Sequence, residues 1–224
     1  MCEQGIFEHS NVAFLTRHVR PDTVAFDVGA NIGLMAIPIL HSCPSCSVVS
    51  FEPSPNVLPF LRKTIASSSV RQRWTLIEKA VADFEGTTRF AVGDPKASLF
   101  DGIHDTHRIG GHKQQTEVPV TALDSVWESK GRPAVSIIKC DVEGGDLAVL
   151  KGARQCLQQT KAVILTEWNL QNLQANGCEP DAILRFSDEI GYRMFSVPAF
   201  SEVTDSTGLR LQMAVTESFA LLPR

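Results

Sequence analysis

The chain has 224 residues, 43% of them hydrophobic, with a formal net charge of -4 and an isoelectric point near 5.9. This length and composition predict a single α/β domain over residues 1–224 with a sizeable core. The acidic balance argues against a nucleic-acid partner, which needs a basic face. No apolar run reaches the length of a membrane span, and the N-terminus lacks a signal-peptide pattern, so we expect a cytoplasmic protein.

The first segments in chain order predict helix, strand and glycine turn. Apolar residues recur at helical spacing over residues 5–20, which predicts a helix within an N-terminal segment, residues 1–20. Thr23 to Val28 then reads as a strand, followed by a turn with Gly29 and Gly33. Leu34 to Ile37 predicts the next helix, which Pro38 should bend or shorten. Asp27 is expected at the carboxyl end of the strand, facing a ligand site.

Two cofactors fit this turn. A dinucleotide requires G-x-G-x-x-G, but Asn31 stands in place of the second glycine. S-adenosylmethionine (SAM) has no phosphate and carries a cationic sulfonium and an amino group, which Asp27 can hold. The turn therefore favours SAM, with a dinucleotide or a turn without ligand as the alternatives.

The second and third strands extend the same edge. Cys46 to Phe51 predicts a strand that ends before Glu52, an acid well placed for two ribose hydroxyls. A helix should start at Ser54 and Pro55 and run to Ser67. Trp74 to Ile77 predicts the third strand, and Ala80 to Asp83 should lie at the same edge. There Asp83 is a candidate for the adenine amino group, or simply a turn residue before Gly86.

Residues 87–121 read as a strand-loop-strand excursion. The strands are 87–92 and 117–121, and Pro119 places the second one at a sheet edge. The polar loop between them, residues 93–116, is long enough to be a substrate lid. Its histidines, His104, His107 and His112, are a base, metal ligands or solvated loop residues.

Two further strands complete the centre of the sheet. Residues 134–141 are almost continuously apolar, which predicts a central strand before Asp141, Glu143 and a helix from Leu147. Residues 162–167 predict the fifth strand, ending in Glu167. A helix over 181–190 and strands over 192–195 and 211–215 should follow.

Acids end four of these strands: Asp27, Glu52, Asp141 and Glu167. Four carboxylates at one sheet edge repel one another unless a cation or hydrogen-bond donors join them. The sulfonium and ammonium groups of SAM are one answer, and a divalent metal at Asp141, Glu143 and Glu167 is another. Alternatively, the acids cap helices and pair with lysines such as Lys139.

Cys43 and Cys46 form the only C-x-x-C pair. A redox pair or half of a zinc site are its functional interpretations, but no second pair has matching spacing. We expect these thiols to be structural.

In this order, the blocks at 26–33, 51–53, 121–125, 138–144 and 150–153, followed by Glu167, resemble the FkbM-type SAM-dependent methyltransferases. The resemblance spans roughly residues 20–170, and the Lys-x-Asp-Val-Glu-Gly block at 139–144 is its most specific part. It implies a Rossmann-like class I methyltransferase fold, mostly parallel with an antiparallel C-terminal strand. It also implies O-methylation of a small-molecule hydroxyl on a sugar or natural product.

The resulting hypothesis assigns roles by residue. Asp141 is the first choice for the base, with Glu143 and Glu167 as supporting acids or metal ligands and Lys139 orienting the acceptor. The expected cofactor contacts come from four segments of the chain: Asp27, Gly29, Ala30, Asn31, Gly33, Glu52, Pro53, Val81, Asp83 and Asp141. An NAD(P)-dependent oxidoreductase and a non-catalytic cofactor-binding protein are the alternatives.

Overall fold

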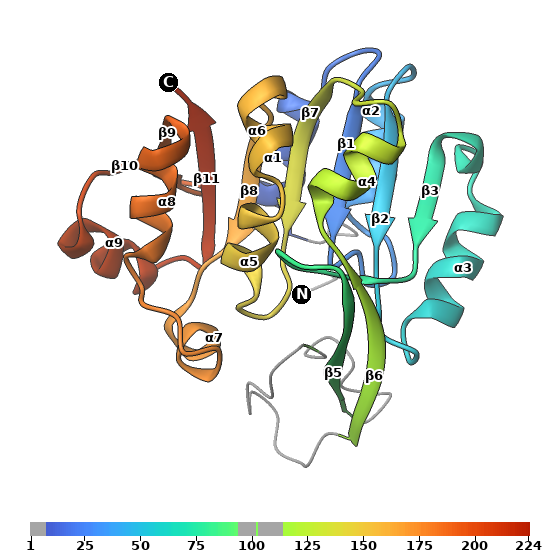
Figure 1. Ribbon diagram of the computed structural model, residues 1–224. Helices are drawn as coiled ribbons and strands as arrows, with labels where there is room; N and C mark the ends of the chain where they lie inside the picture. Colours follow the sequence, from blue (N-terminus) through green and yellow to red (C-terminus); the bar gives the residue numbers. More distant parts are fainter. Residues whose placement is uncertain (1–7, 94–101, 103–113) are drawn as a thin grey trace.

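An eight-stranded sheet forms the centre of the molecule (Figure 1). The computed structural model describes residues 8–93, 102 and 114–224. The strand order is β10-β9-β11-β8-β7-β1-β2-β3, parallel from β8 to β3 and antiparallel where β11 pairs with β8 and β9. The bounds are β1 Val24–Val28, β2 Ser47–Phe51, β3 Trp74–Ile77, β7 Val135–Cys140, β8 Val163–Glu167, β9 Tyr192–Ser196, β10 Glu202–Val203 and β11 Ser218–Pro223. This confirms the predicted doubly wound α/β fold.

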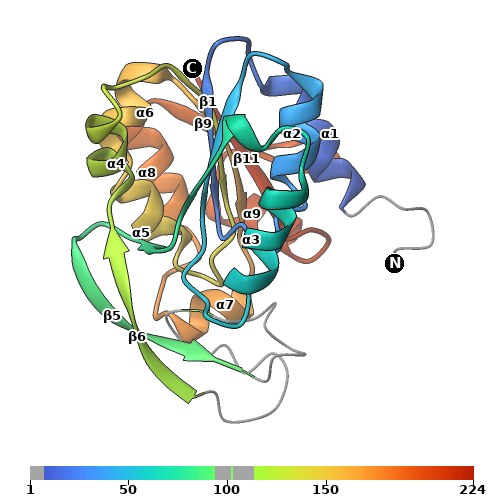
Figure 2. The same cartoon turned by 90° about the vertical axis from the view of Figure 1, so that its right-hand side faces the viewer.

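Helices cover both faces of the sheet (Figure 2). One face carries α1 His9–His18, α2 Ala36–Ser42 and α3 Leu58–Ser67, with the 3-10 turn η1 Arg71–Arg73 before β3. The other carries α4 Leu123–Ser129, α5 Asp146–Lys151, α6 Arg154–Thr160 and α8 Ala182–Ile190. Successive residues of β1 point to opposite sides, so Ala25 packs in one hydrophobic core and Phe26 in the other. Both are fully buried, which gives the sheet two apolar faces.

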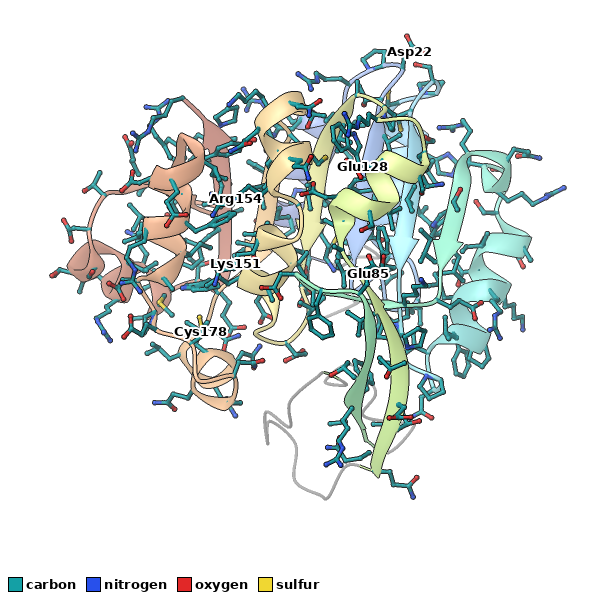
Figure 3. The ribbon with its side chains drawn as sticks, viewed as in Figure 1. Asp22, Glu85, Glu128, Lys151, Arg154 and Cys178 are labelled. Atoms are coloured by element: carbon teal, nitrogen blue, oxygen red, sulfur yellow. The ribbon has the colours of Figure 1, made fainter. Side chains whose placement is uncertain are left out.

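A small three-stranded sheet extends from the main body. It consists of β4 Ala80–Val81, β5 Gly86–Val92 and β6 Gln114–Thr121, in the order β4-β6-β5. Glu85, labelled in Figure 3, fastens its base, because its carboxylate accepts hydrogen bonds from Thr121 Oγ1 and the Ala122 amide, each 2.9 Å long. The predicted strands of the excursion are confirmed. Of the predicted loop, residues 93–116, the structure describes Gly93, Gly102, which is bridged to Ala91, and residues 114–116, which belong to β6. The rest of the predicted lid, with its three histidines, lies outside the described residues.

The prediction that Pro119 marks an edge strand is wrong for β6 as a whole, which lies between β4 and β5. However, β4 pairs only with Val120 and Thr121, whereas Pro119 is paired on one side alone, with Thr87 of β5. The proline therefore occupies a position where a single neighbouring strand is present, and a missing N–H is tolerated there.

Two helices start later than the sequence predicts. The first begins at Ala36, so Leu34 and Met35 belong to the loop after β1, and Pro38 lies in the first turn of α2 rather than late in it. The second begins at Leu58 with Pro59 in its first turn, not at Ser54 and Pro55. Proline fits a first turn because its missing N–H has no intrahelical acceptor there.

The prediction of a strand over residues 211–215 is also wrong. This stretch belongs to the end of α9 (Ser206–Met213) and the turn after it, and the last strand is β11. Leu211 and Val215 are exposed, whereas Phe219, Ala220 and Leu221 of β11 are fully buried. The short helix α7 (Leu170–Ala175) was not predicted, and the N-terminal helix is described only from His9. None of the helices in the described ranges is long and apolar enough to cross a membrane.

Candidate active site

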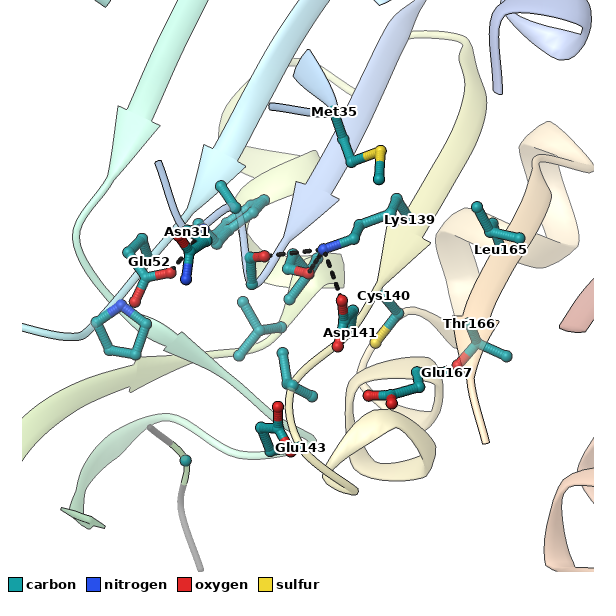
Figure 4. A pocket seen from close by; sticks show the side chains of 18 of the residues that line it. Asn31, Met35, Glu52, Lys139, Cys140, Asp141, Glu143, Leu165, Thr166 and Glu167 are labelled. Atoms are coloured by element: carbon teal, nitrogen blue, oxygen red, sulfur yellow. Dashed lines mark hydrogen bonds and ion pairs between the residues drawn. The ribbon is translucent and has the colours of Figure 1, made fainter. Parts of the chain in front are cut away.

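A cavity of about 670 Å³ opens at the carboxyl ends of β1, β2, β7 and β8 (Figure 4). Its wall includes the glycine turn after β1, the start of the loop after β2, the acidic loop after β7 and the end of β8. Ligands in open α/β sheets bind at this edge, outside the carboxyl ends of the strands. Of the predicted site residues, these line it: Gly29, Ala30, Asn31, Glu52, Pro53, Val81, Lys139, Asp141, Glu143 and Glu167.

The glycine turn is tight and partly left-handed. Gly29 has φ +72°, Asn31 φ +50° and Gly33 φ +90°. A Cβ on Gly29 would lie 1.9 Å from the backbone oxygen of Asp141, and one on Gly33 would lie 2.7 Å from the ring of Trp74. Asn31 tolerates the left-handed region better than most residues, which explains how it replaces a glycine here.

Glu52 joins this turn to the loop after β2. Its Oε2 accepts a hydrogen bond from the Asn31 amide and its Oε1 accepts one from the Ser54 amide, both 2.9 Å long. The side chain is almost fully buried at the cavity wall. Two backbone donors therefore fix its orientation at the wall, and a carboxylate is an acceptor for a ligand's hydroxyls.

The structure separates the two residues expected to surround adenine. Val81 lines the cavity together with Pro53, Lys79 and Ala80. Asp83 is exposed and is not among the lining residues, because the chain passes toward Gly152 after β4. Its proximity to the third strand in sequence therefore did not place it at the cavity.

Asp27 likewise does not line the cavity, although the sequence predicts that it faces a ligand. It is fully buried beneath the wall, where Ser50 Oγ donates to its Oδ2 over 3.2 Å and Lys139 Nζ lies 3.9 Å from its Oδ1. Burial raises the pKa of Asp27, and the Lys139 ammonium opposes that rise. Asp27 therefore fits the alternative interpretation of the strand-end acids, in which an acid pairs with Lys139.

Three carboxylates gather on the other side of the cavity. Oxygens of Asp141, Glu143 and Glu167 all lie within 4.8 Å of one another. Asn169 Nδ2 donates to Glu167 Oε1 over 2.9 Å, and Asn172 Nδ2 lies 3.4 Å from Oε2. Burial, together with the nearby acids, raises the pKa of Glu167 well above its ordinary value. At neutral pH this cluster therefore holds a proton on Glu167, unless a cation replaces it.

The loop that carries Glu143 is held from α7. Glu143 adopts φ +55° and Gly144 φ +90°, and a Cβ on Gly144 would lie 2.6 Å from the backbone oxygen of Asn172. Asn176 Nδ2 donates to the Glu143 carbonyl over 3.0 Å and to the Asn172 carbonyl over 2.8 Å. A left-handed glutamate at a cavity wall is an unusual conformation that its surroundings must stabilise.

Sequence reasoning missed one whole wall. Asn11 near the start of α1 and Glu217 and Ser218 at the start of β11 line the cavity, and Asn11 Nδ2 donates to Ser218 Oγ over 3.0 Å. These residues lie 207 positions apart, so no local pattern could have revealed the contact. Only the antiparallel return of β11 beside β8 brings them together.

The C-x-x-C pair lies outside the cavity wall. Cys43 and Cys46 are buried in the core beneath α2, and burial raises the pKa of the Cys46 thiol to about 11. A thiol that stays protonated at neutral pH is a poor nucleophile and a poor metal ligand. This agrees with a structural role.

A family model described as the methyltransferase FkbM domain matches residues 27–194. The chain belongs to this family. Three curated relatives are similar to it: the hexuronic acid methyltransferase AglP of Haloferax volcanii, the 2-O-methyltransferase NoeI of Sinorhizobium fredii and the 31-O-demethyl-FK506 methyltransferase FkbM of Streptomyces tacrolimicus. Their identities are 29%, 27% and 29%, over 70%, 74% and 60% of this chain. The matches span 61%, 71% and 60% of those relatives, so this FkbM-family chain corresponds to about three-fifths of two of them.

Solved structures agree on the fold. A methyltransferase FkbM from Methylobacillus flagellatus has a TM-score of 0.57 at 14% identity, over 94% of this chain and 50% of its own. The precorrin-6y C5,15-methyltransferase of Geobacter metallireducens has a TM-score of 0.54 at 15% identity, over 99% and 91%. The FkbM-family chain thus has the Rossmann-like class I methyltransferase fold.

Proposed function

We propose that this FkbM-family protein transfers a methyl group from SAM to a hydroxyl of a small molecule, a sugar or a natural product. The observation that carries the proposal is the cavity itself, which the glycine turn, Glu52 and the acids at the ends of β7 and β8 line together. Membership of the FkbM family and its methyltransferase relatives support it. A cytoplasmic location and the absence of a nucleic-acid partner stay predictions of the sequence.

The residues present fit this cofactor. Glu52 is oriented by two backbone amides and suits the ribose hydroxyls, and the left-handed turn at Gly29 and Asn31 lets a ligand approach the main chain. Val81, with Pro53 beside it, provides an apolar edge for adenine. Asp27, Gly33 and Asp83 have no part in these contacts, because none of them lines the cavity.

When bound, SAM supplies an electrophilic methyl group, and the protein must position and deprotonate the acceptor hydroxyl. Asp141 and Glu167 are adjacent acids in different environments. Glu167 has a raised pKa and keeps its proton, whereas Asp141 is partly exposed and lies 3.5 Å from the Lys139 ammonium. Asp141 is therefore the proposed base, because its carboxylate faces the cavity beside a cation, and Glu167, whose pKa burial raises, is the neighbouring acid. Holding the acceptor in line with the methyl group provides much of the acceleration.

A divalent cation is the second possibility for the cluster of Asp141, Glu143 and Glu167. The carboxylate set is chemically suitable for Mg²⁺ or Ca²⁺, with all three donors within 4.8 Å. A proton on Glu167 relieves the same repulsion. We propose the metal-free alternative, with the proton on Glu167.

Calorimetric titration with S-adenosylhomocysteine tests the cofactor. We expect one site in the wild type and loss of binding in Glu52→Ala. Arg62→Ala, at an exposed surface ion pair, is the control variant. Binding that survives Glu52→Ala would refute the role of Glu52, and a folded wild type that binds only reduced nicotinamide would replace the proposal with the oxidoreductase alternative. Asp141→Asn should then retain cofactor binding and lose methyl transfer.

A further inference from the structure

Lys139 is buried on β7, next to β1, at the floor of the cavity. It is the penultimate residue of β7 and lies beside Asp27 of β1 in the parallel register. Only 6% of it is exposed, yet it reaches the cavity wall (Figure 4). The sequence suggests that this lysine orients the acceptor, and its surroundings point to a different role.

The ammonium group is surrounded by protein acceptors. Its Nζ donates to the Gly29 carbonyl over 2.8 Å, and the Val28 carbonyl lies at 3.5 Å. Carboxylate oxygens of Asp27 and Asp141 lie at 3.9 Å and 3.5 Å. An ammonium has three N–H donors, and these four groups surround it, so the protein itself occupies them.

These contacts connect the glycine turn to the acidic loop. Gly29 is held on one side by Lys139, through its carbonyl, and on the other by the backbone of Asp141, which leaves no room for a Cβ. Lys139 also places a positive charge between Asp27 and Asp141, whose carboxylates would otherwise repel each other. Both effects fix the part of the wall where the turn meets the base.

We propose that Lys139 is a positioning residue, which sets the glycine turn for the amino-acid half of the cofactor and contacts neither the acceptor nor the adenosine half. The inference rests on the proposed function, because it concerns how the same cavity holds SAM. The contacts of Lys139 described above lie at Gly29, Asp27 and Asp141, whereas the adenosine half would lie beside Glu52 and Val81, so we expect that half to be bound independently.

The test compares two probes that differ in the amino-acid half. S-adenosylhomocysteine carries it, and 5′-methylthioadenosine lacks it. Lys139→Met removes both the donor and the charge, Lys139→Gln keeps a donor for the Gly29 carbonyl, and Lys151→Met removes an exposed lysine at the end of α5 as a control (Figure 3). Kd values for both probes are measured by calorimetry, together with the thermal midpoint of each variant.

In Lys139→Met we expect the Kd for S-adenosylhomocysteine to rise by about tenfold or more, in line with the loss of a charged hydrogen bond. The Kd for methylthioadenosine should stay within about threefold, because Glu52 keeps its hydrogen bond from the Ser54 amide, which lies outside the turn. Lys139→Gln should recover part of the lost affinity, and Lys151→Met should match the wild type.

Three outcomes would overturn the inference. Unchanged affinity for S-adenosylhomocysteine in Lys139→Met would show that the turn does not need the lysine. An equal loss for both probes would indicate a general structural role. Lys139→Met leaves Asp27 buried without its cation, so the single variant can fail to fold. In that case the double variant Asp27→Asn with Lys139→Met, which removes both charges, replaces it. The third outcome against the inference is normal affinity for S-adenosylhomocysteine in this double variant. A folded wild type that binds neither probe would instead refute the proposed function, and the inference with it.

Discussion

Asp146 is a buried acid whose ionisation should lower the stability of the protein. It is the first residue of α5, has no exposed surface, and accepts a hydrogen bond from Thr166 Oγ1 over 2.8 Å. Burial, and next the nearby Asp141, raise its pKa from 3.8 to about 6. We predict that Asp146→Asn, which keeps the size of the side chain and an acceptor for Thr166, removes this penalty.

The magnitude follows from the difference between the folded and unfolded pKa. About two pKa units separate them, and at about 1.4 kcal/mol for each unit the ionised Asp146 costs about 3 kcal/mol. The folded state binds the proton more tightly. The stability that this proton provides is therefore complete below pH 3.8 and is lost as the pH rises through about 6. Between pH 4.5 and pH 7.5 the loss is about 2 kcal/mol.

Urea unfolding of the wild type and of Asp146→Asn at both pH values measures the difference. Groups distant from Asp146 titrate equally in the two proteins, so the free energy of unfolding of the variant relative to the wild type should rise by about 2 kcal/mol from pH 4.5 to pH 7.5. Asp22→Asn, at an exposed position (Figure 3), is the matched control for the loss of one carboxylate. A difference that stays constant across this range would refute the assignment of a raised pKa to Asp146.

Three other predictions concern the cavity wall. Gly29→Ala should abolish S-adenosylhomocysteine binding and lower the thermal midpoint far more than Gly131→Ala. Both glycines have positive φ, but of the two only Gly29 would bring a Cβ against another backbone segment. Equal effects of the two substitutions would contradict this packing argument. Dialysis against a chelator should leave the Kd for S-adenosylhomocysteine unchanged. If the chelator instead weakens binding, Mg²⁺ restores it, and Glu167→Gln no longer responds to either, the acidic cluster holds a cation. Asn176→Ala should speed amide hydrogen exchange around Glu143 by about tenfold, because a side-chain hydrogen bond to that carbonyl is lost; unchanged exchange would show that α7 does not hold the loop.

Local sequence patterns were sufficient for most of the central sheet. Residues 135–140 form a fully buried parallel strand, as their continuous apolar character predicts, and Gly191 with φ +74° ends α8 as a C-terminal glycine should. The run 211–215 misled because it is mostly apolar, like a short buried strand, yet Leu211 and Val215 face solvent. Burial depends on which segment the rest of the chain covers, and a short window does not contain that information.

The candidate site also contains some features that the local sequence predicts and others that it does not. The sequence by itself determined the glycine turn, Glu52 and the acids after β7 and β8, because the carboxyl ends of parallel strands meet at one edge. Only the tertiary structure decided which acids face the cavity: Asp27 is turned inward to Lys139, and the return of β11 adds Glu217. The physical reason is that a motif fixes backbone conformation over a few residues. The partner of a buried charge, and the wall opposite a strand, are fixed by segments far away in the chain.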